Sequence, residues 1–174
     1  MAPTDFDFTA APLFQNMTLA EREAIAGRLR HESYAQGDTV LREGRSVQIL
    51  WIIARGRCEV VKTGKNGSPQ QLAVLEQGTL FGEMSFFRPA PHSASIRTLT
   101  EVEVFRLDRA DYDDLEETNP GAAHRIAVNV TMILADRLRK MDEWICDLVA
   151  RPDGAPHRDE WREFRSKLYS NWQF

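Results

Sequence analysis

The sequence reads Phe81-Gly82-Glu83-Met84-Ser85-Phe86-Phe87 and then Pro91-His92-Ser93-Ala94-Ser95 at the point that decides its fold. A Gly-Glu pair leads into a short apolar helix, and a proline with a run of small residues then leads into a strand. Backbone N–H groups at the start of such a helix point at an anion, and a glycine lets the backbone approach closely. A glutamate beside them accepts hydrogen bonds from ribose-type hydroxyls. The stretch therefore predicts a small cradle for an anion.

The residues around this stretch form short strand-like runs separated by glycine turns. Gly37-Asp38 and Arg55-Gly56 are turn signals of this kind. Strands are expected at residues 39–41, 49–53, 58–61, 71–75, 94–99 and 102–107. Strands at intervals of roughly 8–12 residues are typical of an all-β barrel or roll. The pattern predicts a mainly β fold with flanking helices.

Two helices flank the strands. Thr18 and Glu21 form a capping box, which predicts a helix over residues 19–30. That helix is expected to bury Leu19, Ile25, Ala26 and Leu29. Asn119-Pro120 opens a second helix of about 30 residues, well above the usual ~11–12. Its apolar positions recur at steps of three and four residues: Ile126, Val130, Ile133, Leu134, Leu138, Met141, Ile145 and Leu148. Part of a helix of that length is expected to extend beyond its own domain or to pair with another element.

These features resemble the cyclic nucleotide-binding domain family from about Leu13 to about Leu148. Residues 81–95 resemble its phosphate-binding cassette, and the order Gly-Asp, Gly, apolar strand, Arg-Gly resembles its jelly-roll half. The resemblance implies a jelly-roll β-barrel within residues 13–150, with an N-terminal helix and a C-terminal dimerisation helix. Residues 1–12 are expected to be a flexible arm. Residues 151–174 are expected to form a linker and a short amphipathic helix.

The resemblance also implies a ligand site, which consists of Phe81, Gly82, Glu83, Met84, Ser85, His92, Ser93 and Ala94. Glu83 matches the acid that binds ribose in the family. The family usually carries an arginine nine residues after this acid, whereas this chain has His92. An arginine offers phosphate a planar fork that is always charged. A neutral histidine offers one donor, so affinity is expected to be roughly ten- to a hundredfold lower or more.

Other groups could offset part of this loss. A nearby phosphate would raise the pKa of His92 above its usual ~6.5. Arg88 and Arg97 are additional cations in the same region.

The resemblance implies a non-enzymatic sensor that binds cAMP or cGMP as a stand-alone domain and signals through its C-terminal helix. The same resemblance implies a homodimer through the helix at residues 120–149. Two alternatives stay open. The fold could be a degenerate one that acts as a protein-interaction scaffold, with a protein partner at residues 157–174. Alternatively, the site could bind a cyclic dinucleotide.

Composition and motifs argue against other classes of function. The net charge of −4 and the short segment after residue 156 give no basis for nucleic-acid binding. No signal-peptide pattern is present, and the longest apolar run, residues 49–54, is too short to span a bilayer. The four histidines have no paired spacing, so neither a metal nor another cofactor is expected. No catalytic motif was found. The chain is expected to be a cytoplasmic protein and not an enzyme.

Overall fold

The computed structural model describes residues 6–64 and 66–150, with residues 148–150 described by their backbone alone. Its helices are η1 (Pro12–Phe14), α1 (Leu19–Ala26), α2 (Glu83–Phe87), α3 (Arg109–Thr118) and α4 (Pro120–Ala150). Its strands are β1 (Arg30–Tyr34), β2 (Thr39–Leu41), β3 (Ile49–Arg55), β4 (Cys58–Thr63), β5 (Pro69–Leu75), β6 (Leu80–Phe81), β7 (Ser95–Thr98) and β8 (Val102–Asp108).

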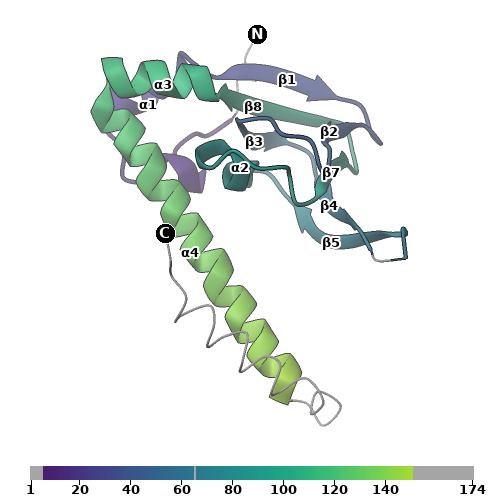
Figure 1. The fold of residues 1–174 in the computed structure, drawn as a ribbon. Helices are drawn as coiled ribbons and strands as arrows, with labels where there is room; N and C mark the ends of the chain where they lie inside the picture. The colour runs from purple at the N-terminus through teal and green to yellow at the C-terminus, as the bar shows by residue number, and fades with distance from the viewer. Residues whose placement is uncertain (1–5, 65, 151–174) are drawn as a thin grey trace. The chain divides into compact units, whose positions relative to one another are not determined.

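The strands form two antiparallel sheets of four strands each. The order is β1-β8-β3-β6 in one sheet and β2-β7-β4-β5 in the other. Consecutive strands repeatedly change sheet, so the two sheets share one interior (Figure 1). This arrangement confirms the predicted jelly-roll β fold with flanking helices.

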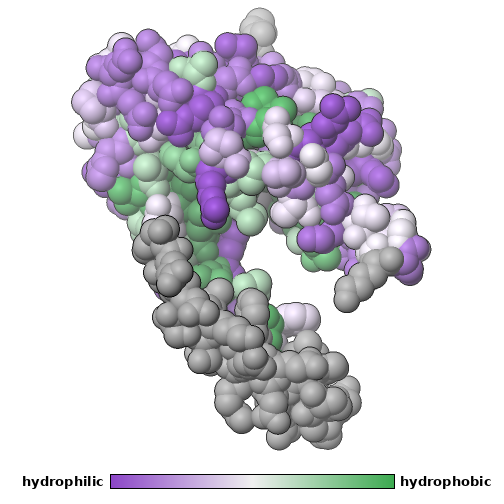
Figure 2. Space-filling model, in the orientation of Figure 1, coloured by the Kyte–Doolittle hydropathy of each residue, from purple (hydrophilic) through white to green (hydrophobic). Residues whose placement is uncertain are grey.

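The core of the roll is built by apolar side chains from both sheets. Its buried members are Leu41, Trp51, Ile53, Cys58, Phe81, Ile96, Val102 and Val104. In β7 the buried Ile96 and Thr98 alternate with the exposed Arg97, whereas β3 is buried at every residue from Leu50 to Ala54. Figure 2 shows mostly hydrophilic side chains over the visible face of the sheets and α3.

Strands β1 and β6 were not predicted from the sequence. Residues 30–34 are mostly polar, but they pair with β8 from Arg30 opposite Arg106 to Tyr34 opposite Val102. Strand β6 has two residues and pairs with Trp51 and Ile52 of β3. Pairing with a distant strand, rather than local propensity, therefore determines both.

Helix α1 begins as predicted but is shorter than expected. The Thr18 N–H donates to a Glu21 carboxylate oxygen at 2.7 Å, and the Glu21 N–H donates to the Thr18 hydroxyl at 3.2 Å, which completes the capping box. Ile25 is fully buried, whereas Leu19 is 65% exposed and Ala26 is also exposed. The expected burial of Leu19 and Ala26 was wrong, because Ile25 is the buried residue of this helix. Leu29 lies beyond the end of the helix and is half-buried.

The described part of the N-terminal segment packs against the domain. The rings of Phe6 and Phe8 lie 5.4 and 5.0 Å from the ring of Phe105 in β8, and Ala11 is 1% exposed. Phe6, Phe8 and Ala11 are therefore packed, although a flexible arm was expected over residues 1–12. The aromatic side chains supply this packing without any periodic pattern.

Helix α4 spans two compact units, one ending at Val130 and one beginning at Thr131. In the first unit, the side-chain amide of Asn129 donates to the backbone oxygens of Leu13 and Gln15 at 2.7 and 2.9 Å. The side chain of Leu148 and the amphipathic helix expected within residues 151–174 lie outside the described residues. No described helix is both long enough and apolar enough to cross a bilayer.

Candidate functional site

Gly82 sets the backbone of the cassette. It precedes α2 with φ at +85°, a left-handed conformation that L side chains rarely adopt. A Cβ atom at this position would lie 2.5 Å from the backbone oxygen of Ile49 and 2.7 Å from the indole of Trp51. Only glycine therefore allows the start of α2 to approach strand β3 this closely.

Trp51 forms the floor of the cassette on the β3 side. Its indole stacks on the ring of Phe81 at 5.4 Å, with 7° between the planes, and meets the ring of His92 at 6.4 Å. Sequence reasoning assigned residues 49–53 to a buried strand and gave this residue no role in the site. No local signal distinguishes it, because its cassette partners lie 30 or more residues away in the sequence.

Three polar residues of the cassette lie inside the protein. Glu83 at the start of α2 is 6% exposed, Ser85 two residues later in the same helix is 3% exposed, and His92 is 6% exposed. The Ser85 hydroxyl and the Nδ1 atom of His92 share a buried hydrogen bond of 3.1 Å. When the hydroxyl donates, the proton of the neutral imidazole is on Nε2. Nε2 is buried and has no hydrogen-bond partner among the described residues.

The backbone of His92 is held by the loop between β2 and β3. The His92 N–H donates to the backbone oxygen of Arg45, and the His92 oxygen accepts from the Gly44 N–H, both at 2.9 Å. Burial lowers the pKa of His92 from its ordinary value of 6.5, and the Glu83 carboxylate partly opposes the change. The imidazole is therefore neutral at pH 7 in the ligand-free protein.

The lowered pKa of His92 predicts a pH dependence of stability. Below about pH 6.5 the unfolded chain binds a proton at this residue more readily than the folded chain. The free energy of unfolding should therefore fall as the pH drops from about 7.5 to about 5.5 in urea titrations. His92→Gln should flatten this part of the profile, whereas His124→Gln, at an exposed position of α4, should leave it unchanged. Equal pH profiles for the wild type and His92→Gln would contradict the assignment.

The other predicted site residues lie at the surface of the cassette. Met84 is 64% exposed, Ser93 is exposed, and the Ser93 hydroxyl lies 4.0 Å from the Met84 sulfur. Ala94 is half-buried. Arg88 and Arg97 are exposed, and Arg97 lies within β7, opposite Thr39 and Glu59. The structure thus brings Glu83, Ser85 and His92 together inside, with Met84 and Ser93 outside.

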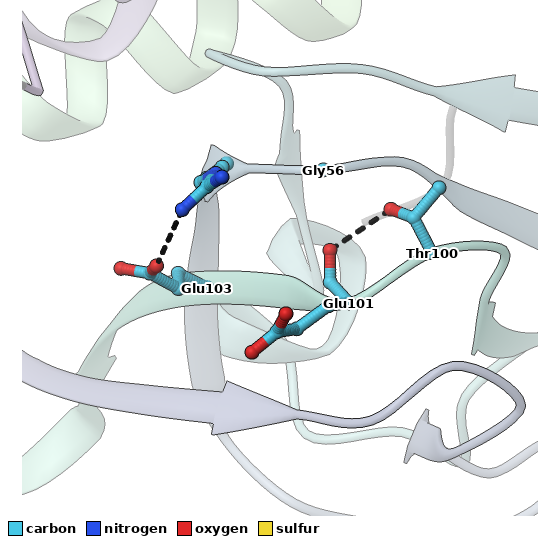
Figure 3. A pocket seen from close by; sticks show the side chains of 5 residues that line it. Gly56, Thr100, Glu101 and Glu103 are labelled. Atoms are coloured by element: carbon cyan, nitrogen blue, oxygen red, sulfur yellow. Dashed lines mark hydrogen bonds and ion pairs between the residues drawn. The ribbon is translucent and has the colours of Figure 1, made fainter.

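A separate hollow lies where β3 turns into β4 (Figure 3). It measures about 250 Å³ and is lined by Arg55, Gly56, Thr100, Glu101 and Glu103. Its polar groups have partners: Arg55 pairs with Glu103 at 3.7 Å, and the Thr100 hydroxyl donates to the Glu101 backbone oxygen at 2.9 Å. These contacts stabilise the turn. The cassette is the better candidate because it contains a buried polar atom that has no hydrogen-bond partner among the described residues, His92 Nε2.

No group of three or more histidine, cysteine or acidic side chains is arranged to hold a metal ion within the described ranges.

Comparison with known proteins points to one family. A sequence model described as Cyclic nucleotide-binding domain matches residues 31–119. A Cyclic AMP receptor protein of Thermus thermophilus is 33% identical over 132 residues, which cover 76% of this chain and 59% of that protein. A cAMP-dependent protein kinase regulatory subunit of Blastocladiella emersonii is 32% identical over 104 residues, covering 60% of this chain and 26% of that protein.

Solved structures show the same fold. The Catabolite Activator Protein of Thermus thermophilus superposes with a TM-score of 0.70 at 31% identity, over 79% of this chain and 63% of that one. A cyclic nucleotide-binding domain from Methylobacillus flagellatus superposes with a TM-score of 0.72 at 22% identity, over 77% of this chain and 75% of that one. The chain spans 59% and 60% of the length of two bacterial relatives.

Proposed function

Because this chain belongs to the cyclic nucleotide-binding domain family, we propose that it is a non-enzymatic regulatory protein that binds a cyclic mononucleotide in its cassette. Two of the relatives named above are a Cyclic AMP receptor protein and a cAMP-dependent protein kinase regulatory subunit, and both names refer to cAMP. We therefore take cAMP as the first candidate ligand and cGMP as the second. In this proposal the occupied cassette signals through the C-terminal helix.

The observation that carries the proposal is the unsatisfied Nε2 atom of His92. A buried polar atom without a hydrogen bond costs free energy, which a ligand can recover by supplying an acceptor. A phosphate oxygen is such an acceptor, and Glu83 is buried nearby as the partner for ribose hydroxyls. One neutral donor binds phosphate less strongly than an arginine fork, so this part of the site supports modest affinity.

Glu83→Gln tests the proposed ribose contact. The change keeps the size of the side chain but removes the charge, so its hydrogen bonds to hydroxyl donors weaken. We expect calorimetric titration with cAMP to show affinity lower by on the order of tenfold. Glu101→Gln, the same change at the exposed turn between β7 and β8, should bind as the wild type does. Equal affinity of the wild type and Glu83→Gln would remove Glu83 from the site.

The same titration separates the two alternatives. Heat from cyclic di-GMP alone would favour the dinucleotide reading. If cAMP, cGMP and cyclic di-GMP give no heat at millimolar concentration, the remaining hypothesis is the protein-interaction scaffold, with its partner expected at residues 157–174.

We also propose that the protein is a homodimer through the helix at residues 120–149. The support is a series of exposed apolar side chains on the part of α4 that belongs to the second unit: Met132, Leu138, Met141 and Trp144. Exposed apolar side chains gathered on one helix are typical of protein interfaces. Light scattering of the purified protein, which gives its mass in solution, tests this proposal.

A further inference from the structure

The cassette has a hydrogen-bond donor for an anion but lacks a positive charge at its centre. His92 is buried, and its pKa is lowered by that burial, so the imidazole contributes N–H but no charge. A cyclic phosphate carries a negative charge, and desolvating it without a cation is unfavourable. A functional site therefore needs a cation from another part of the fold.

The loop between β2 and β3 is fixed against the cassette at several points. The Glu43 N–H donates to the Ser95 hydroxyl at 2.9 Å, and the Gln48 side chain donates to the backbone oxygen of Phe86 at 2.9 Å. Between these anchors, Gly44 and Arg45 both bond to the backbone of His92. Two loop residues thus oppose one cassette residue, as in a β-bulge.

Arg45 is the cation that this loop places beside His92. Its backbone oxygen lies 2.9 Å from the His92 nitrogen, and its side chain is exposed. Several other arginines pair with carboxylates, including Arg28, Arg30, Arg55, Arg106, Arg109 and Arg139. Arg45 forms no ion pair with a described residue. The neighbouring Glu43 carboxylate accepts the Thr63 N–H at 2.9 Å instead.

We propose that Arg45 supplies the positive charge for the anionic group of the ligand, in place of the arginine that the family carries at the position of His92. Two residues then provide what a single arginine provides in the family, namely a hydrogen-bond donor and a positive charge. The imidazole of His92 donates a hydrogen bond from inside the protein, and the guanidinium of Arg45 neutralises the anion from the loop. The inference rests on the proposed function, because it assigns a further residue to the same site.

The test is calorimetric titration of the full chain with cAMP and cGMP. Arg45→Gln should weaken binding by on the order of tenfold or more, because a charge-assisted contact is lost. Arg57→Gln is the matched control, because it removes the same charge from another exposed residue. The backbone oxygen of Arg57 accepts from the N–H of Leu99, which follows the last residue of β7. The affinity of Arg57→Gln should stay within about twofold of the wild type. Added salt should weaken binding by the wild type more than by Arg45→Gln.

A second pair of variants distinguishes the failure of this inference from the failure of the proposed function. His92→Arg restores the family's fork, so Arg45→Gln should cost less affinity in that background than in the wild type. Unchanged affinity of Arg45→Gln, or a loss at Arg88→Gln in its place, would overturn the inference. Binding by His92→Arg without binding by the wild type would also overturn the inference, because it would show that Arg45 does not neutralise the anionic group of the ligand. No binding by either protein would overturn the proposed function as well.

Discussion

Replacing Gly82 by alanine is expected to lower the free energy of unfolding by about 2–5 kcal/mol and to abolish nucleotide binding. The left-handed backbone costs a non-glycine residue about 1–2 kcal/mol, and a methyl group forced into a packed region costs about 1–3 kcal/mol more. The methyl group would lie 2.5 Å from the Ile49 oxygen, which belongs to strand backbone and cannot move aside cheaply. Denaturant unfolding at neutral pH measures this loss.

Gly78→Ala is the control that separates the clash from the backbone strain. Gly78 has φ at +82°, but a Cβ atom there would have no heavy atom within 4 Å. Its substitution should cost only the backbone term of about 1–2 kcal/mol. Equal losses at Gly78 and Gly82 would show that the close approach of α2 to β3 is not important for stability.

Phe86→Ala is expected to lower the free energy of unfolding by about 3–5 kcal/mol. Phe86 is fully buried, and its ring lies 5.4 Å from the ring of Tyr112 in α3. The guanidinium of Arg109 lies 5.7 Å from the centre of the Phe86 ring. The residue thus fixes the cassette helix against α3, so its removal should also weaken nucleotide binding. Urea unfolding and calorimetry on the same variant measure the two effects.

Phe87→Ala provides the comparison on the next residue of α2. The ring of Phe87 is 37% exposed, so its removal should cost roughly half as much or less. If Phe87→Ala destabilised the protein as much as Phe86→Ala, burial of the Phe86 ring would not explain the attachment of α2.

The sequence predicted those parts of the fold that depend on local signals. The capping box at Thr18, six strand-like runs and the start of α4 after Asn119 each follow from neighbouring residues. Strand β1 was missed because its polar residues form a strand only by pairing with β8. The packing of Phe6 and Phe8 was missed for the same reason, since their partner Phe105 is distant in the sequence.

The candidate site was predictable only in part. The stretches at residues 81–87 and 91–95 identified the cassette, and the structure brings Glu83 and His92 together inside it. The sequence did not indicate that His92 is bonded to Ser85, or that it is buried, which lowers its pKa. Trp51 and Arg45 reach the cassette from β3 and from the loop before β3, so only the folded sheets reveal them.

The central claim is that a cyclic nucleotide binds in the cassette, and an NMR titration that follows each backbone amide tests it most directly. With increasing cAMP, the amide signals of Gly82, Glu83, Ser85 and His92 should shift and saturate together. The signals of Arg30–Tyr34 in β1 should change little. This strand is at one edge of its sheet, and β6, which leads into the cassette, is at the opposite edge. Signals that stay unchanged in the cassette at millimolar cAMP and cGMP, or that shift only in β1, would contradict the account.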